Sequence, residues 1–300
     1  MDIEKIKKSI QLRDRCVRVL SKNGHFRVSC VKNTKTAQTA QLNHSLDDVS
    51  AVILAKSLSG ASLAASFLKG EERVVLDFDG TGPIKKVYAE ALQIGEVRGF
   101  VDFKDSTSEI TDFNTPLGEG VLRVSRILYN RAEPITGIVE LHKGDIATDL
   151  AFYYNQSEQV PTAVILDSIV DDNGLILESG GLILQALPGH KDIEILEIFS
   201  VLSNLPRLTE LLSDGLNPQK ILKKILPFEF DLINSTQVDF FCRCSKDSFT
   251  SRILTLGLNN IIEMQNANQN ELVCHYCNKH YYFDDNDFAS IKEQLIAKNN

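Results

Sequence analysis

The organisation of this chain is decided by two short stretches, FCRC at residues 241–244 and CHYC at residues 274–277. Each stretch supplies two thiols, and 29 residues separate them. Two such pairs can converge on one tetrahedral ion, and shells of four sulfur ligands are typical of structural zinc. The spacing therefore predicts one zinc ion, held by Cys242, Cys244, Cys274 and Cys277.

The cysteine spacing leaves two uses of the metal open. The first is a purely structural clip, a common use of four-cysteine sites. The second is an oxidation switch, because a disulfide across a single intervening residue closes a strained ring, and strained disulfides are labile. Zinc keeps its ligands as thiolates, which is the form that oxidants attack. The single residue between Cys242 and Cys244 favours the switch, and loss of the metal should unfold so small a segment.

Two histidines and two further cysteines are not expected to take part in the zinc site. His275 and His280 lie close to the second cysteine pair, but four thiolates already complete a zinc shell, so we expect neither histidine to bind. Cys16 and Cys30 stand in apolar, strand-like segments, where a free cysteine behaves as a small hydrophobic side chain. We expect these two thiols to play no part in the switch.

The segment before the cysteine pairs, residues 190–233, holds only helix-type patterns. Prolines cut it into short helices at Pro206, Pro218 and Pro227. Short helices are marginal alone and need a surface to pack on. We therefore interpret residues 190–234 as a helical linker whose order depends on its neighbours.

The first 189 residues mix strand and helix patterns, which indicates an α+β fold. Alternating apolar and polar residues around Asn23-Gly24 predict a hairpin. Two helices are expected, at residues 44–68 and 144–159. Further strands are expected at residues 74–78, 85–91, 99–103, 120–127, 137–141, 164–169 and 182–187.

Four parts of the chain follow from these patterns. We expect an N-terminal α+β core domain at residues 1–189, the helical linker at 190–234, a small four-cysteine zinc domain at 235–290 and a C-terminal tail at 291–300. Residues 1–14 are charged and helix-like, without the apolar segment of a secretion signal. The apolar stretch at residues 46–68 carries charged side chains, which disfavours a membrane span. A soluble cytoplasmic protein without a membrane partner is therefore expected.

The charge balance disfavours a nucleic-acid partner. The chain carries 40 acidic against 32 basic side chains, a formal net charge of -8, whereas binding to phosphates is driven by an excess of Lys and Arg. Residues 236–300 hold six Lys or Arg against eight Asp or Glu. A zinc ribbon that binds nucleic acid is therefore disfavoured, and the aromatic residues of this region are expected to pack around the zinc instead.

A second motif points to a different chemistry. Residues 74–81 read VVLDFDGT, which looks like the nucleophile loop of haloacid-dehalogenase-type phosphatases, with Asp77 as the nucleophile and Asp79 as the acid/base. Residues 144–149, GDIATD, resemble the magnesium site of that family. The catalytic loop should lead into a helix, whereas the residues after Gly82 have a strand pattern. A magnesium-dependent phosphatase is therefore kept only as the alternative function.

The cysteine segments and several upstream motifs resemble one known family. The motifs are CRCS at 242–245, CHYCN at 274–278, NQSEQVPT at 155–162, GGLILQALP at 180–188 and LKG at 68–70. They are similar, in the same order along the chain, to motifs of the heat-shock protein 33 family. Members of that family are redox-regulated bacterial holdase chaperones.

The resemblance implies a function and a mechanism. The reduced protein would bind zinc through its four cysteines and be inactive. Oxidants would form the disulfides Cys242–Cys244 and Cys274–Cys277, release the zinc, and unfold the zinc domain and the linker. The exposed apolar surface would hold unfolding client proteins, as a homodimer and without ATP. No enzyme activity is expected, and the sequence contains no Walker A motif.

Overall fold

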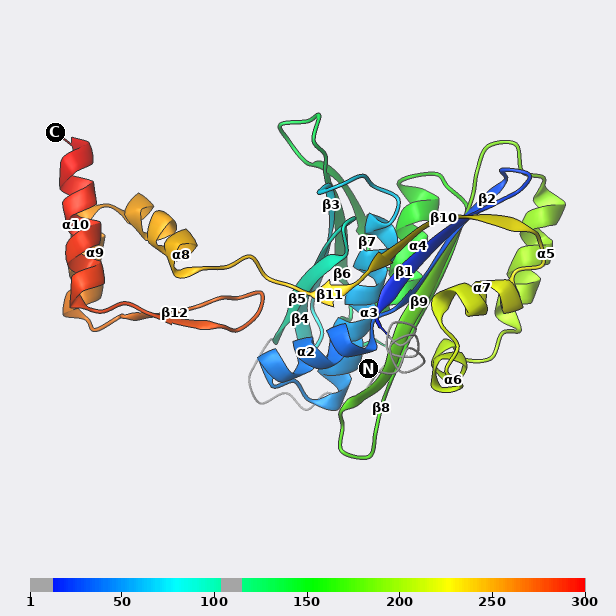
Figure 1. Ribbon diagram of the computed structural model, residues 1–300, viewed down its shortest axis with the longest axis horizontal. Helices are drawn as coiled ribbons and strands as arrows, with labels where there is room; N and C mark the ends of the chain where they lie inside the picture. Colours follow the sequence, from blue (N-terminus) through cyan, green and yellow to red (C-terminus); the bar gives the residue numbers. More distant parts are fainter. Residues whose placement is uncertain (1–12, 104–114, 300) are drawn as a thin grey trace, which may run out of the picture. The chain divides into compact units, whose positions relative to one another are not determined.

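Figure 1 shows the computed structural model, which describes residues 13–103 and 115–299. The chain forms two compact units, Met1–Phe241 and Cys242–Asn300. Both units contain helices and strands, which confirms the α+β class. The helix-like character expected for residues 1–14 falls almost wholly outside the described residues.

The first unit contains a five-stranded antiparallel sheet with the strand order β10-β1-β2-β9-β8. Its strands are β1 (Arg15–Ser21), β2 (Phe26–Lys32), β8 (Thr162–Val170), β9 (Ile176–Ala186) and β10 (Phe230–Gln237). The hairpin expected around Asn23-Gly24 is confirmed, and Gly24 takes the left-handed φ of 76° that such turns favour. Strand β10, which comes last in the sequence, closes the edge of the sheet beside β1.

A second, six-stranded sheet has the order β11-β5-β4-β3-β6-β7. Its strands are β3 (Arg73–Gly80), β4 (Ile84–Leu92), β5 (Glu96–Phe103), β6 (Gly120–Ile127), β7 (Ile135–Glu140) and β11 (Asp239–Phe240). Only the short β11 runs parallel to its neighbour, β5. One continuous stretch, β10 followed by β11, therefore supplies an edge strand to each of the two sheets.

Helix α3 (Asp48–Ala65) packs against strands of both sheets and forms the centre of the main core (Figure 1). It is long and apolar enough to cross a membrane, but 89% of it is buried inside the fold, as in the core helix of a globular unit. The single helix expected at residues 44–68 is wrong at its start. Helix α2 (Thr34–His44) ends at Ser45, which has a left-handed φ of 51°. Asp47 then caps α3 by accepting a hydrogen bond from the backbone N–H of Ser50.

Helix α4 (Ile146–Gln156) lies within the helix expected at residues 144–159 and begins at a cap formed by Asp145. Its apolar side joins the main core through Ile146, Leu150 and Tyr153. The expected strands of the first unit are all present, with bounds that differ by a few residues.

Three short helices cover the face of the five-stranded sheet that is turned away from α3. They are α5 (Asp192–Ser203), α6 (Leu208–Ser213) and α7 (Pro218–Ile225). The aliphatic side chains that they bury under this face are Ile198, Leu202, Leu208, Leu211, Leu212, Ile221, Leu222 and Ile225. The expectation of helix patterns alone up to residue 233 is wrong, because β10 begins at Phe230 and pairs with β1.

The second unit is small. It contains α8 (Lys246–Ile253), a 3-10 turn η1 (Leu254–Leu256), α9 (Leu258–Asn266), the hairpin β12 (Glu271–Val273) and β13 (His280–Tyr282), and α10 (Asp285–Asn299). Helix α10 runs through the limit expected at residue 290. Ile291 and Leu295 on this helix are buried in the core of the unit, so this part of the expected tail is packed.

Candidate metal centre

A tight turn between β12 and β13 positions the second cysteine pair. The backbone N–H groups of Cys277 and Asn278 donate to the carbonyl oxygen of Cys274, at 3.3 Å and 2.7 Å. Asn278 adopts a left-handed φ of 55°, a conformation that asparagine tolerates better than most residues. Cys274 also donates its N–H to the carbonyl of Lys279 at 2.8 Å. The turn brings the two thiols of this pair close to each other.

The first pair lies in the extended segment between β11 and α8. Ser245 ends this segment as the cap of α8 and accepts a hydrogen bond from the backbone N–H of Ser248 at 3.1 Å. The hydroxyl of Tyr281, on β13, donates to the carbonyl oxygen of Cys244 at 3.0 Å. These contacts hold the segment that carries Cys242 and Cys244 against the hairpin.

The four sulfur atoms form one cluster, in which all lie within 4.8 Å of one another. The Sγ atoms of Cys242 and Cys274 are 3.7 Å apart, and those of Cys244 and Cys277 are 3.4 Å apart. A tetrahedral shell with zinc–sulfur bonds of about 2.3 Å places its sulfurs about 3.8 Å apart. The cluster therefore fits one ion. Within residues 13–103 and 115–299, no other group of three or more His, Cys, Asp or Glu side chains converges in this way.

The surroundings of the sulfurs are partly apolar. Cys274 is buried, and the other three thiols are half-buried. Burial raises the pKa of Cys274 and of Cys277 above the ordinary value of a thiol. Burial also tends to raise the pKa of Cys244, but hydrogen bonds from Tyr281 and from the neighbouring thiols lower it below its ordinary value. A bound cation would stabilise all four thiolates, as metal ions do with coordinating thiols.

Tyr281 was not foreseen as part of the site. Its hydroxyl lies 3.2 Å from the Sγ of Cys244, within hydrogen-bonding distance. The sequence suggested only that the aromatic residues here pack around the metal, and the ring of Tyr281 does pack against Phe249. An aromatic residue four positions after the second pair is a weak signal, because only the fold shows where its hydroxyl points.

The core that supports the cluster is small. The buried apolar side chains of the second unit are Ile253, Ile261, Cys274, Tyr281, Phe283, Phe288, Ile291 and Leu295. Three of the four cysteines pack against this core as partly buried side chains. Units of this size rarely bury enough apolar surface to be stable alone and usually need a metal or disulfides. The cysteine cluster is thus placed to supply stability that the core cannot.

The two histidines near the cluster are not part of it. His280 pairs with Glu271 across the β12–β13 hairpin instead. His275 lies in the turn, and the convergent group consists of the four cysteines alone. The geometry therefore fits a shell of four thiolates.

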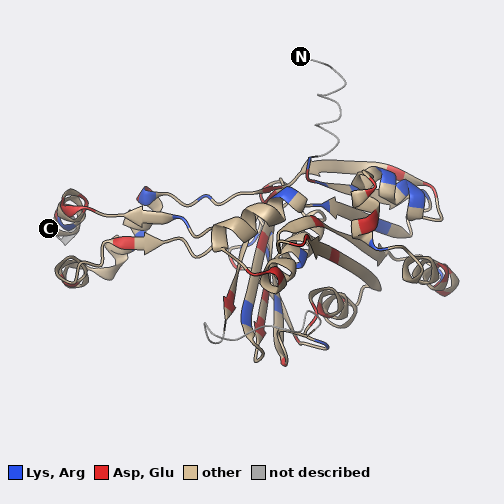
Figure 2. Ribbon diagram, turned by 90° about the horizontal axis from the view of Figure 1, so that it is seen from below, with Lys and Arg blue, Asp and Glu red and all other residues tan. Residues whose placement is uncertain are grey.

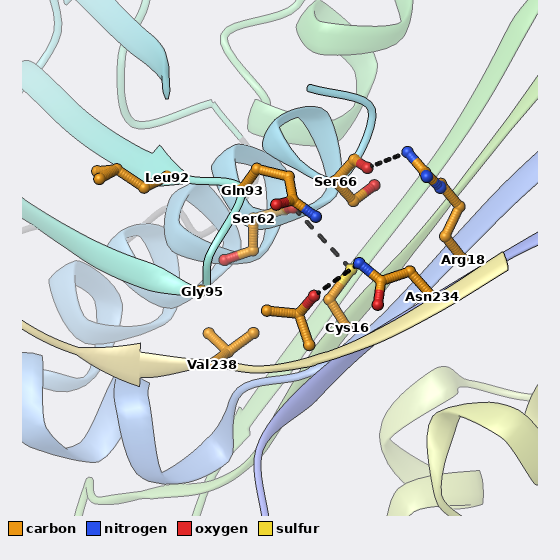
Figure 3. Close-up of a pocket in the computed structure, with 10 residues that line it drawn as sticks. Cys16, Arg18, Ser62, Ser66, Leu92, Gln93, Gly95, Asn234 and Val238 are labelled. Carbon is orange, nitrogen blue, oxygen red and sulfur yellow. Dashed lines mark hydrogen bonds between the residues drawn. The ribbon is translucent and has the colours of Figure 1, made fainter. Parts of the chain in front are cut away.

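Cys16 and Cys30 lie in the first unit and are both free thiols. Successive side chains of a strand point to opposite faces of the sheet. Cys16 points to one face and packs in the main core, whereas Cys30 points to the other face and packs in the apolar cluster under the linker helices. Cys16 lines a cavity of only about 10 Å³ (Figure 3), and its sulfur lies 4.0 Å from the carbonyl oxygen of Ser62. Burial raises the pKa of Cys16 to about 12 and raises that of Cys30 as well.

The structure does not support the phosphatase alternative. Asp77 and Asp79 lie within β3, a strand that pairs antiparallel with both β4 and β6, and no helix follows it. Acidic and basic residues, red and blue in Figure 2, occupy neighbouring strands of this sheet. Asp77 pairs with Lys86 at 2.9 Å, and Asp79 pairs with Arg123 at 3.0 Å. These carboxylates belong to cross-strand ion pairs, and a nucleophile loop is absent from the described residues.

Both aspartates of the supposed magnesium motif have structural roles as well. Asp145 caps α4 by accepting from the backbone N–H of Thr148 at 2.9 Å. Asp149 is fully buried and accepts hydrogen bonds from the backbone N–H groups of His142 and Lys143, at 2.7 Å and 2.9 Å. Both aspartates therefore fix the start of a helix.

Fold and site together define an α+β protein with a small C-terminal unit built on a four-cysteine cluster of the kind that holds zinc. The family described as "Hsp33 protein" matches residues 14–284. The chain is 33% identical to a 33 kDa chaperonin of Desulforamulus reducens, over 96% of this chain and 100% of the relative. It is 31% identical to a 33 kDa chaperonin of Bacillus subtilis, over 94% and 99% of the two chains.

A solved structure shares the fold. The crystal structure of a 33 kDa chaperonin, a heat shock protein 33 homolog, from Thermotoga maritima superposes with a TM-score of 0.86 at 26% identity, and covers 95% of this chain and 99% of that one. This chain belongs to the Hsp33 chaperone family.

Proposed function

We propose that this protein is a redox-regulated, ATP-independent holdase chaperone, with no catalytic activity of its own. The observation that carries the proposal is the convergence of four sulfurs, at distances that fit one tetrahedral ion, in a unit with a small core. In the reduced state Cys242, Cys244, Cys274 and Cys277 would hold one zinc ion as thiolates. When bound, zinc supplies a cross-link among four points of the chain and keeps the sulfurs deprotonated.

Oxidation would remove the ligands from this site. Cys242 would form a disulfide with Cys244, and Cys274 would form one with Cys277. Each disulfide forms when two thiolates give two electrons to one molecule of a peroxide oxidant, which takes up two protons and becomes two molecules of water. A sulfur in a disulfide no longer offers a thiolate to a metal. The second unit would then lose the cross-link that its small core requires.

The first unit offers a route by which this loss reaches an apolar surface. Only Phe241 separates β11 from Cys242, and β10 and β11 are edge strands that hold only one neighbour each. The linker helices just before them bury eight aliphatic side chains against one face of the five-stranded sheet. Short helices depend on such packing for their order. Their release would expose a continuous apolar surface, of the kind that binds other proteins.

The partners that fit such a surface are unfolded or partly unfolded client proteins. We propose that the oxidised protein acts as a homodimer in the cytoplasm, as the family resemblance implies. The relatives are named chaperonins, which supports binding of client proteins as the function. The family likeness thus supplies the function, and the cysteine cluster supplies its control.

Zinc content and chaperone activity test the proposal together. The reduced protein should contain one zinc ion per chain, and Cys244→Ser should lower that content, while Cys16→Ala, outside the cluster, should not. Light scattering of a heat-denatured client should be suppressed by the peroxide-treated protein and not by the reduced protein. Equal zinc content in the wild type and Cys244→Ser, or equal suppression by both redox forms, would contradict the proposal.

A further inference from the structure

A cavity of about 110 Å³ lies in the first unit, far along the sequence from the four cysteines. Its walls come from β2, the end of α3, β6, the end of α4 and β9. A single water needs only about 10–15 Å³ of such space. The cavity is therefore large enough for a small organic molecule. The two motifs at residues 155–162 and 180–188 supply Glu158 and Gln185 to its wall, and the cysteine cluster makes no use of either.

Arg27, on β2, brings an uncompensated positive charge to this cavity. Its Nε donates to the side-chain oxygen of Gln185 at 2.8 Å, and its guanidinium carbon lies 4.2 Å from the centre of the Phe67 ring. Within residues 13–103 and 115–299, no carboxylate lies within ion-pair distance of it. Burial lowers the pKa of Arg27, but an arginine stays charged at neutral pH.

The second arginine of the cavity is already paired. Arg126, on β6, binds Glu158 at 2.8 Å, and the hydroxyl of Tyr153 donates to the same carboxylate at 2.7 Å. Both contacts are made to one oxygen, Oε1, of Glu158, and this carboxylate lies beyond ion-pair distance of Arg27. Two arginines and one glutamate leave this wall with one net positive charge.

Gln185 keeps Arg27 in a fixed position. Gln185 is fully buried, and its amide nitrogen donates to the hydroxyl of Thr162 at 3.2 Å, which orients its oxygen toward Arg27. With Nε engaged and the plane stacked on Phe67, the Nη groups have no acceptor among the described residues. A planar, pre-positioned guanidinium is the usual binding partner of a carboxylate.

A structural role alone leaves this arrangement unexplained. A half-buried charge without a counter-ion is costly, and a cavity of about 110 Å³ beside it has room for a ligand that supplies one. A ligand that completes this site carries a single negative charge and has a size that fits the cavity. We propose that the cavity binds a small organic carboxylate, whose charged end contacts Arg27 and whose apolar part lies against the Phe67 ring.

Two kinds of molecule carry a carboxylate of this type. The carboxylate can belong to a free organic acid, or it can be the C-terminal carboxylate of a peptide. The charge of the wall favours a singly charged carboxylate over inorganic phosphate, which is in part doubly charged at neutral pH. The site is independent of the cysteine cluster and of the proposed chaperone function.

Isothermal titration calorimetry on the reduced full-length protein tests the proposal. Acetate and benzoate should bind saturably at one site, and inorganic phosphate should bind more weakly. Arg27→Gln should weaken benzoate binding by about tenfold to 100-fold, because a hydrogen bond to a charged group is lost. Arg123→Gln is the control, since it removes the same kind of charge from an arginine of the same unit that pairs with Asp79 outside the cavity.

A measurement on the unmodified chain covers the case in which Arg27→Gln does not fold. Phenylglyoxal labels accessible arginines, and mass spectrometry can follow Arg27 and Arg123 separately. Benzoate should slow the labelling of Arg27 in a saturable manner and leave that of Arg123 unchanged. A short peptide with a free C-terminus, compared with its amide, then assigns the source. Protection by the free peptide indicates a peptide ligand, and protection by benzoate alone indicates a free acid.

Three results would overturn the proposal. The first is no saturable binding of acetate or benzoate by calorimetry together with no protection of Arg27. The second is binding of phosphate in preference to both carboxylates. The third is equal loss of benzoate affinity in Arg27→Gln and Arg123→Gln.

Discussion

Leu222→Ala should loosen the linker helices in the reduced, zinc-bound protein. Leu222 lies on α7, has 0% of its surface exposed, and belongs to the same apolar cluster as Cys30 of β2. Helix α7 packs directly on β2. Truncation of this side chain leaves a cavity at the contact between helix and sheet, and the zinc site is not touched.

The size of the effect follows from the burial of the residue. A fully buried leucine replaced by alanine costs about 2–5 kcal/mol of stability. If α7 leaves the sheet in a local opening, the open population should rise by about 30-fold to 4,000-fold. Cys30 is 0% exposed under these helices, so its alkylation requires the opening. Its alkylation rate should rise by the same factor while reclosing remains faster than the reaction.

The assay is alkylation of the reduced, zinc-bound protein by iodoacetamide, with each cysteine followed by mass spectrometry. Cys16 is the internal reference, because it lies on the opposite face of the sheet, in the main core. Leu150→Ala is the matched control, since Leu150 is equally buried but belongs to the main core. It should not raise the rate of Cys30 relative to Cys16. An unchanged Cys30 rate in Leu222→Ala, or equal acceleration of both thiols, would refute the reasoning.

Two further predictions concern contacts beside the site and the linker. Tyr281→Phe removes the hydroxyl next to Cys244 and should lower zinc affinity by about 10–100-fold in competition with a chelator, because partners of metal ligands tune the site. Asp167 binds Arg207 at 2.7 Å, at the start of α6, and Asp167→Asn should release this contact. The packing of the linker helices on the sheet should weaken by about 1–3 kcal/mol. Faster alkylation of Cys30 would measure this loss. Protonation of Asp167 at low pH should weaken the packing of the linker helices in the same way. Burial tends to raise the pKa of Asp167, but Arg207 and Thr209 hold it below 3.8, so its contribution is full above that pH and is lost as the pH falls through the depressed value.

Both substitutions have controls in the same chain. Tyr282→Phe changes an exposed tyrosine next to Tyr281 and should leave zinc affinity unchanged. Asp171→Asn changes a partly exposed turn residue just after β8 and should leave Cys30 protected. Zinc affinity lowered equally in both tyrosine variants would contradict the role of the Tyr281 hydroxyl. Unchanged Cys30 alkylation in Asp167→Asn would contradict the clamp on α6.

Local patterns predicted much of the fold. Strands with alternating apolar residues were found where expected, and the hairpin at Asn23-Gly24 formed because its turn chemistry is local. The convergence of the four thiols followed from their spacing in the sequence. Helix α2 was missed, because the expected helix started at residue 44, and Ser45 gives no sequence signal for the left-handed conformation that separates α2 from α3.

Long-range contacts could not be predicted in the same way. Strand β10 carries few apolar residues and exists because it pairs with β1, more than 200 positions earlier. The hydroxyl of Tyr281 and the cavity at Arg27 depend on segments that meet only in the folded chain. A single sequence records which side chains are present, whereas these features depend on which of them become neighbours.

Zinc release and free-thiol count, followed together during oxidation of the reduced protein by peroxide, test the central claim most directly. The account predicts that one zinc ion leaves each chain as four thiols disappear, and that Cys30 becomes open to alkylation only after this release. A reduced, folded protein without zinc would contradict the account. So would a protein that keeps its zinc after all four thiols of the cluster have been consumed.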